Sequence, residues 1–291
     1  MSGAASASAV PPARLGVRLR WPASPIVTLA AGFVGLLIVL AVFGDWLAPH
    51  PPMLQSLLNV NQKPSQAHWL GTDALGRDMS SRMIAGARAG LLGPLVVATT
   101  GALLSSLLGI ASGYLGGAVD MVIQRFVDFM FALPGLLIAI VLVGTIGGGY
   151  WFAVAVLSAL NFYGGVRIVR GAAVEQRPLA YVEAARTLGI KRWRIMYVHI
   201  FRNIIAIVFA QAALDFAVAL VALSGLAFLG LGSQLGSPEW GRMLADNEAI
   251  LFTNPAAAMA PGFAIVLTAT SVTLIGDWVY DRFSYSGRGE R

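Results

Sequence analysis

The segment YVEAARTLGIKRWRIMYVHIFRN, residues 181–203, is a polar stretch enclosed by two strongly apolar runs. Only 12% of the residues in the chain are charged, and the mean hydropathy is +0.74. Soluble domains carry about 25% charged residues, so this composition indicates a protein of the lipid bilayer. The fold class therefore depends on how the apolar runs are placed around the polar stretch.

Residues 178–203 predict two short helices joined by a hinge. Pro178 suits a first helical turn, and Gly189 is a natural helix end. Beyond it, one apolar face is expected to hold Ile190, Trp193, Met196 or Tyr197, and Ile200, with basic residues opposite. On physical grounds alone, such an element either docks on a partner protein or rests on anionic membrane lipid.

Six apolar segments reach the length of about 20 residues that a membrane span needs. They lie near 26–47, 91–115, 127–147, 150–170, 204–229 and 258–280. If the N-terminus is cytoplasmic, most of the 20 lysines and arginines fall on the cytoplasmic side, as the positive-inside rule requires. We therefore predict an all-α membrane protein with six transmembrane helices, both termini in the cytoplasm, and 178–203 as a cytoplasmic loop.

This topology divides the chain into a cytoplasmic N-tail (1–25), a first span (26–47), an extracytoplasmic segment (48–90), a five-span core (91–282) and a cytoplasmic C-tail (283–291). The first apolar run is too long for the core of a signal peptide. Residues from Arg77 onward, with an Asp78–Arg82 pair, predict an amphipathic lead-in helix on the membrane surface, with a ligand contact as the alternative. Trp240 is either an interfacial anchor or a partner contact.

The charge and residue types exclude several classes of function. Topology explains the net charge of +6, so no nucleic-acid partner is expected. The chain has no cysteine, and His50, His68 and His199 show no ligand spacing, so we predict no metal site. There is no G-x-x-x-x-G-K-[ST] phosphate loop and no catalytic constellation, which predicts a non-catalytic chain.

Several motifs together carry a family resemblance. The EAARTLG run, Glu183 to Gly189, resembles the EAA signature of ABC importer permeases. HWLGTDALGRDMSSRMIAGAR, GYLGGAVDMVIQRFVDFMFALPGLL, LAFLGLG, SPEWGRML, PGFAIVLT and GDWVYD follow the order found in C-type permeases of the dipeptide/oligopeptide/nickel group. The resemblance covers roughly residues 65 to 282. It departs from the family pattern at Arg202, which stands where the signature usually has a proline.

The resemblance implies a type I importer permease fold in the bacterial inner (plasma) membrane, with a cytoplasmic EAA coupling helix. In that family the coupling loop docks on an ATPase, which implies this role for Glu183, Ala184, Ala185, Arg186, Thr187, Leu188 and Gly189. The implied partners are a second, homologous permease, one or two cytoplasmic ATPase subunits and an extracytoplasmic substrate-binding protein. ATP and Mg²⁺ would be bound by the ATPases, so this chain itself would hold no cofactor.

Polar residues inside predicted spans are costly and need a reason. Asp215 lies near the middle of the fifth span, one turn from Gln211. They either line the translocation path or make an interhelical contact, including a contact to the second permease. Asn161 and Tyr163 are further candidates for the path. For Asp128 we expect a structural ion pair or a helix-end role.

The resulting hypothesis is an ATP-driven importer permease for dipeptides or oligopeptides that works by alternating access. The same transporter type could instead carry nickel or another small ligand, because the resembling group includes such importers. A gradient-driven secondary transporter is the rival class; it predicts more ionisable residues in the spans and inverted repeats. A membrane-anchored structural or receptor component is a second rival, and it would not require the hinge.

Overall fold

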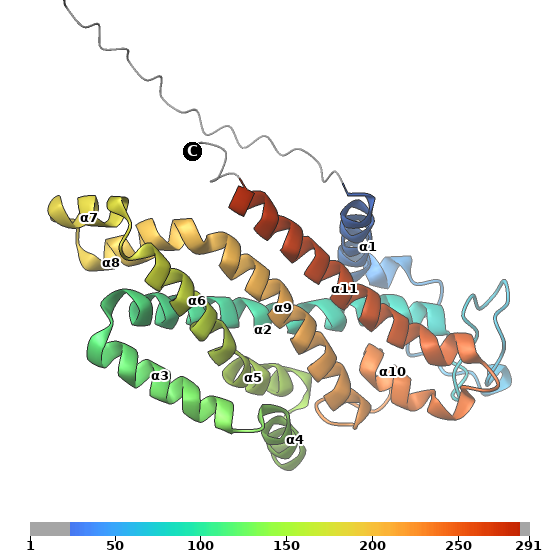
Figure 1. Cartoon of the computed structure of the whole chain (residues 1–291). Helices are drawn as coiled ribbons and strands as arrows, with labels where there is room; N and C mark the ends of the chain where they lie inside the picture. Colours follow the sequence, from blue (N-terminus) through green and yellow to red (C-terminus); the bar gives the residue numbers. More distant parts are fainter. Residues whose placement is uncertain (1–23, 286–291) are drawn as a thin grey trace, which may run out of the picture.

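The computed structural model describes residues 24–285, so the predicted tails lie outside the described residues except at their inner ends. All regular elements of this part are helices (Figure 1). Five helical stretches are long and apolar enough to cross a membrane: Pro25–Leu47, Met79–Leu115, Gly149–Gln176, Arg192–Phe228 and Pro255–Phe283. A bent pair of shorter helices makes a sixth if it counts as one span. The predicted all-α membrane fold is confirmed.

The long helices α2 (Met79–Leu115) and α9 (Phe201–Phe228) form the centre of the molecule. α2 packs against α1 (Pro25–Leu47), α5 (Gly149–Asn161), α6 (Tyr163–Gln176) and α9. α11 (Pro255–Tyr285) packs along α9 and α1. Small residues permit the closest approach, since a Cβ on Gly109 of α2 would lie 2.8 Å from Val169 Cβ of α6.

The third predicted span, 127–147, is wrong as a single straight helix. The structure has α3 (Gly117–Ala132) followed by α4 (Gly135–Ile146), and the two are bent by 71°. Pro134 explains the break, because it lacks an N–H and forces the preceding residue out of the helical region. Leu133 is indeed extended, with φ −89° and ψ 133°.

The amphipathic lead-in helix predicted within 48–90 is the beginning of α2 and not a separate element. α2 runs for 37 residues without interruption, and its first turns are buried instead of lying on a surface. Residues 48–78 before it are mostly irregular, with one short turn, η1 (Leu57–Asn59). Asn254 Nδ2 donates to Gln62 O at 2.9 Å and so ties this loop to the start of α11.

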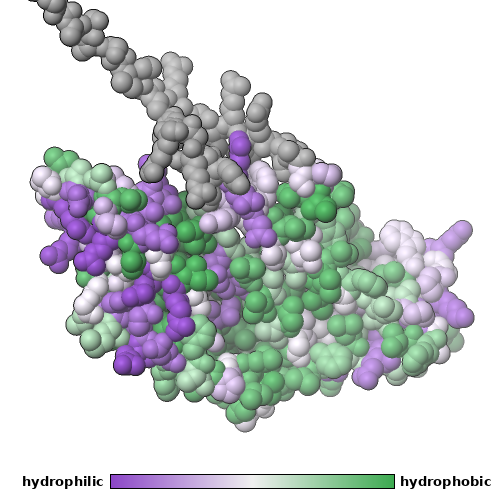
Figure 2. Space-filling view, in the orientation of Figure 1, coloured by the Kyte–Doolittle hydropathy of each residue, from purple (hydrophilic) through white to green (hydrophobic). Residues whose placement is uncertain are grey.

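The two ends of the molecule differ from its middle. Helices α7 (Ala180–Thr187) and α8 (Arg192–Arg194) lie at one end, while the 48–78 loop, α10 (Trp240–Asp246) and the turn η3 (Glu248–Ile250) lie at the other (Figure 1). Figure 2 shows hydrophobic residues over the middle of one face and hydrophilic residues gathered toward the ends. This distribution suits a protein whose middle faces lipid and apolar partners.

Candidate functional site

The predicted coupling segment forms a short helix that is fixed on one side and open on the other. Val182 and Ala185 of α7 are 0% and 5% exposed. They belong to a buried cluster that includes Ile110 of α2, Val169 of α6 and Ile200 at the entry to α9. One buried cluster therefore joins α7 to α2, to α6 and to the π-helical turn before α9.

The outer surface of this segment is free within the chain. Glu183, Ala184, Arg186, Thr187, Leu188 and Gly189 are exposed, and Ala185 alone of the seven predicted coupling residues is buried. Leu188 is 79% exposed, which is unusual for a leucine next to a packed helix. Arg186 turns back toward α2, where its Nε donates to Tyr114 Oη at 3.2 Å and its guanidinium lies 5.0 Å from the Tyr114 ring.

The hinge has the geometry of a Schellman turn. Gly189 adopts φ +71°, its N–H donates to Arg186 O at 3.0 Å, and Ile190 N–H donates to Ala185 O at 3.0 Å. This pair of hydrogen bonds satisfies carbonyls that the end of α7 would otherwise leave open. The predicted helix–hinge–helix is present in the structure.

The apolar face predicted for the second helix is partly wrong. Trp193 is 57% exposed, whereas Ile195, Met196 and Ile200 are buried. The reason is a π-helical turn, η2 (Ile195–Ile200), between α8 and α9, which shifts the side-chain register. Arg202 follows this turn, and the helix continues into α9 without a sharp break, as expected where no proline interrupts it.

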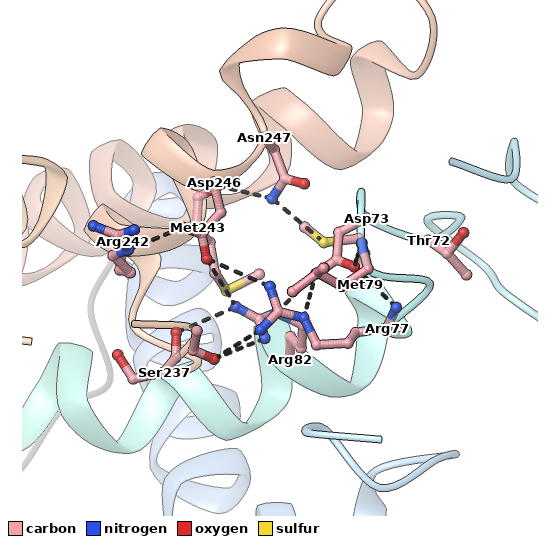
Figure 3. Close-up of polar contacts among 12 residues, drawn as sticks. Thr72, Asp73, Arg77, Met79, Arg82, Ser237, Arg242, Met243, Asp246 and Asn247 are labelled. Carbon is pink, nitrogen blue, oxygen red and sulfur yellow. Dashed lines mark hydrogen bonds and ion pairs between the residues drawn. The ribbon is translucent and has the colours of Figure 1, made fainter. Parts of the chain in front are cut away.

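The opposite end holds a buried charge cluster that sequence reasoning did not find (Figure 3). Arg77 Nε lies 2.6 Å from Asp73 Oδ2, and Arg77 Nη2 lies 3.4 Å from Asp246 Oδ2. Arg82 is 0% exposed, and it donates to Gly236 O at 2.9 Å and to Ser237 O at 3.2 Å. Arg242 completes the group at 2.9 Å from Asp246 Oδ1.

This cluster joins the start of α2 to α10. Asp73, Arg77 and Arg82 are close in sequence and could be recognised as a charged group. Their partner Asp246 lies more than 160 residues away, so no local pattern predicts the contact. Because the charges are buried, each needs its partners to avoid a large desolvation cost.

Two sequence-based interpretations near this cluster are corrected. The predicted Asp78–Arg82 pair is replaced by other contacts, because Asp78 caps α2 by accepting from Ser81 N–H at 2.8 Å. Burial alone would raise the pKa of Asp78, but hydrogen bonds from Ser81, His68 and Ser80 hold that pKa below its ordinary value. Trp240 is neither an interfacial anchor nor exposed to a partner: it is 3% exposed and donates to Met83 O at 3.1 Å.

The polar candidates inside the spans lie within the helix bundle. Gln211 Nε2 donates to Asp215 Oδ1 at 2.9 Å, and Asp215 is 6% exposed. Asp215 Oδ2 faces Gly101 of α2, since a Cβ on Gly101 would lie 3.4 Å from it. That oxygen and Asn161 Nδ2 are buried without a hydrogen-bond partner. Their role in a translocation path stays a prediction.

The structure also places Tyr163 and Asp128, two further residues singled out in the sequence. Tyr163 packs edge-on against Phe131, with ring centroids 4.6 Å apart, near the bend between α3 and α4. Asp128 forms an ion pair with Arg167 at 2.8 Å, which confirms the predicted structural ion pair. Both side chains of that pair are half-exposed, so the pair contributes little to stability.

The described part of the chain is a helical bundle with an anchored loop at one end, and comparison with known proteins identifies its family. Residues 105–285 match the model of the binding-protein-dependent transport system inner membrane component, and residues 19–64 match the N-terminal transmembrane domain of oligopeptide transport permease C. The chain belongs to this family of binding-protein-dependent transport permeases.

Relatives cover nearly the whole chain. It is 35% identical to the probable D,D-dipeptide transport system permease protein DdpC of Escherichia coli K12, over 95% of this chain and 93% of that protein. It is 35% identical to the glutathione transport system permease protein GsiD of Pectobacterium atrosepticum, over 88% and 85%. A dipeptide permease, DppC of Alkalihalophilus pseudofirmus, matches at 35% over 85% and 83%.

Proposed function

We propose that this chain is one of two permease subunits of an ATP-driven importer for short peptides in the bacterial inner membrane. The observation that carries the proposal is α7, which is anchored through Val182 and Ala185 and exposed along its outer surface. Small exposed side chains at Ala184 and Thr187 permit close approach of a partner surface. Peptide chemistry is supported by the relatives, which are named as dipeptide and glutathione permeases.

In this proposal, the end that carries α7 faces the cytoplasm and meets an ATPase subunit that binds ATP and Mg²⁺. The end that carries α10 faces outward, toward a substrate-binding protein. Both chain termini would be cytoplasmic, in keeping with the distribution of lysine and arginine. The chain itself would perform no covalent chemistry.

Alternating access follows from how α7 is attached. When the ATPase subunits close, they would draw the α7 helices of the two permeases together. Since α7 packs on α2, α6 and the entry to α9, that displacement would move those helices together and would open the cavity outward. When the ATPase subunits separate again, the cavity would once more open toward the cytoplasm. The energy would enter through different affinities of the ATPases for ATP in the two conformations.

The direct test is transport by the reconstituted complex. The chain, its second permease, the ATPase subunits and the binding protein are placed in proteoliposomes with ATP inside. We expect uptake of labelled di- or tripeptides that requires ATP and the binding protein, and no uptake of Ni²⁺. Peptide uptake by the permeases alone, driven by an ion gradient, would contradict the proposal.

A further inference from the structure

Two histidines of the 48–78 loop meet at one carboxylate, at the end of the molecule opposite α7. His68 Nδ1 lies 2.9 Å from Asp78 Oδ1, and His50 Nδ1 lies 3.9 Å from Asp78 Oδ2. The two imidazole rings have centroids 5.0 Å apart. One ligand atom from each of the three residues falls within 4.8 Å of the others. Sequence spacing gave no indication of this group, since three separate parts of the chain supply it.

The group is held in place by the surrounding backbone. Asp78 is fixed as the cap of α2, and its Oδ2 accepts hydrogen bonds from Ser80 Oγ at 2.8 Å and Ser81 Oγ at 2.6 Å. His50 N–H donates to the same Ser81 Oγ at 3.0 Å. His68 N–H donates to Ser65 Oγ at 3.1 Å. Both histidine backbones are therefore held beside the carboxylate, and only small side-chain movements separate the three ligand atoms from a common centre.

The donor set and its spacing match a transition-metal site. With metal–ligand bonds of about 2.0–2.1 Å, ligand atoms of a tetrahedral zinc centre lie about 3.3 Å apart. The His68–Asp78 distance of 2.9 Å is already close to this value, and the three ligand atoms lie within 4.8 Å of one another, so no pair has to close by more than about 1.5 Å. The His50 side chain is 42% exposed and so has room to move. Its Nδ1 atom is buried without a hydrogen-bond partner, which leaves a ligand atom available.

We propose that His50, His68 and Asp78 bind a divalent transition-metal ion, best fitted by Zn²⁺, with one coordination position open to water or to a ligand from another protein. Two imidazoles and one carboxylate form a borderline-soft set that suits zinc and disfavours Mg²⁺ and Ca²⁺, which prefer oxygen ligands. Metal would replace the proton between His68 Nδ1 and Asp78 Oδ1, and that proton would pass to solvent.

A bound metal ion would cross-link three points of the chain. His50 follows the end of α1, His68 lies in the irregular loop, and Asp78 begins α2. The metal site would therefore hold the 48–78 loop against the start of α2, next to the buried charge cluster. This inference concerns the end of the molecule away from α7 and does not depend on the proposed coupling to an ATPase.

The test measures Zn²⁺ binding by the full chain, purified with its co-purifying subunits through a tag that contains no histidine. Competition with a chromophoric chelator should give one more equivalent of tightly bound Zn²⁺ per chain than the His50→Gln, His68→Gln double variant. Each single variant should weaken that equivalent by at least about tenfold. His199→Gln removes the third histidine of the chain, in the π-helical turn, and should leave binding unchanged.

A second measurement guards against misfolding of the variants. Zn²⁺ should raise the melting temperature of the unaltered chain and of His199→Gln by several degrees, because a ligand that binds only the folded state stabilises it. The double variant should melt near the metal-free temperature of the unaltered chain and show no shift. Co²⁺ should give visible absorption typical of tetrahedral coordination only where both histidines are present. Equal Zn²⁺ binding and equal shifts in all variants would overturn the proposal.

Discussion

Arg82 is the most deeply buried residue of the charge cluster. It is fully buried, and it lies 3.7 Å from both Asp73 and Asp246 while it also binds two carbonyl oxygens. Replacing it by methionine keeps most of the volume but removes a buried positive charge beside two carboxylates and leaves Ser237 O without its donor. Removal of one partner from a buried ion pair costs about 3–5 kcal/mol. We therefore expect Arg82→Met to lower the free energy of unfolding by an amount of this order, measured by denaturant titration in detergent.

The half-exposed Arg167–Asp128 pair supplies the control for Arg82. Arg167→Met removes the same charge, but an ion pair open to solvent contributes no more than about 1 kcal/mol. The two variants should thus differ clearly in stability. If both variants lost the same free energy of unfolding, burial would not determine how much Arg82 contributes to stability.

Glu239 gives the chain a specific pH dependence. Burial raises the pKa of this carboxyl from its ordinary value of 4.5 to about 7. Because the folded pKa lies above the unfolded one, folding favours the protonated form. This effect makes stability fall as pH rises from about 4.5 to about 7, with no further fall above that range.

The Glu239→Gln variant isolates this effect. Its melting temperature should vary less between pH 5 and 8 than that of the unaltered protein, and the gain should be greatest at the alkaline side of that range. Glu248→Gln, at an exposed position after α10, should reproduce the unaltered profile. A profile that Glu239→Gln leaves unchanged would show that another group titrates instead.

Among the elements, α7 with its hinge is the part that sequence alone predicted most fully. Gly189 as a helix end is a local signal and is confirmed. Of the apolar face expected at Leu179, Val182, Ala185 and Leu188, Val182 and Ala185 are buried, whereas Leu179 and Leu188 are exposed. The face of the next helix was mispredicted at Trp193, because a π-helical turn changes the periodicity without a sequence signal that we could read. Pro134 did not by itself predict the break of the third span, because membrane helices tolerate proline, and the 71° bend is seen only in the structure.

The hinge itself can be tested with a pair of glycine substitutions. At Gly189, φ +71° disfavours any side chain, by roughly 1–2 kcal/mol, although a Cβ there would meet no atom within 4 Å. Gly189→Ala should therefore disturb the hinge through the backbone alone. We expect it to reduce ATP-dependent uptake more than it reduces the amount of folded protein in the membrane.

Gly171 in α6 is the matched control for the hinge. It is exposed, and an added Cβ would meet nothing within 4 Å. Gly171→Ala should retain uptake and should stabilise the helix by up to about 1 kcal/mol. If both alanine variants transport equally well, the left-handed conformation of Gly189 is not needed for coupling.

For the whole molecule, the sequence sufficed for the all-helical membrane class, because long apolar runs are local properties; its six apolar segments correspond to five candidate spans and one bent pair of helices. The sequence did not reveal that the start of α2 meets α10, since Arg77 and Arg82 contact Asp246, which lies more than 160 residues further along the chain. The meeting of His50 and His68 at Asp78 was hidden for another reason. Both histidines lie in the irregular 48–78 loop, where no periodic pattern in the sequence predicts which side chains meet.

The orientation of the molecule in the membrane can be measured cleanly because the chain contains no cysteine. Single substitutions Gln66→Cys in the 48–78 loop and Lys191→Cys after the hinge both fall at exposed positions. In intact cells, a membrane-impermeant thiol reagent should label the chain at position 66 and not at 191. Labelling at 191 should require permeabilised cells. The reverse result would place α7 outside and would contradict coupling to a cytoplasmic ATPase.

Docking of α7 on an ATPase subunit is tested most directly by reversing charge at its exposed surface. The chain would be co-expressed with its partner subunits, carrying either Glu183→Lys on α7 or Glu248→Lys at the opposite end, both at exposed positions. We expect Glu183→Lys to lose most of the co-purifying ATPase subunit and the ATPase stimulation by loaded binding protein, while Glu248→Lys keeps its ATPase subunit. Full retention and full stimulation in Glu183→Lys would contradict the proposed docking at Glu183.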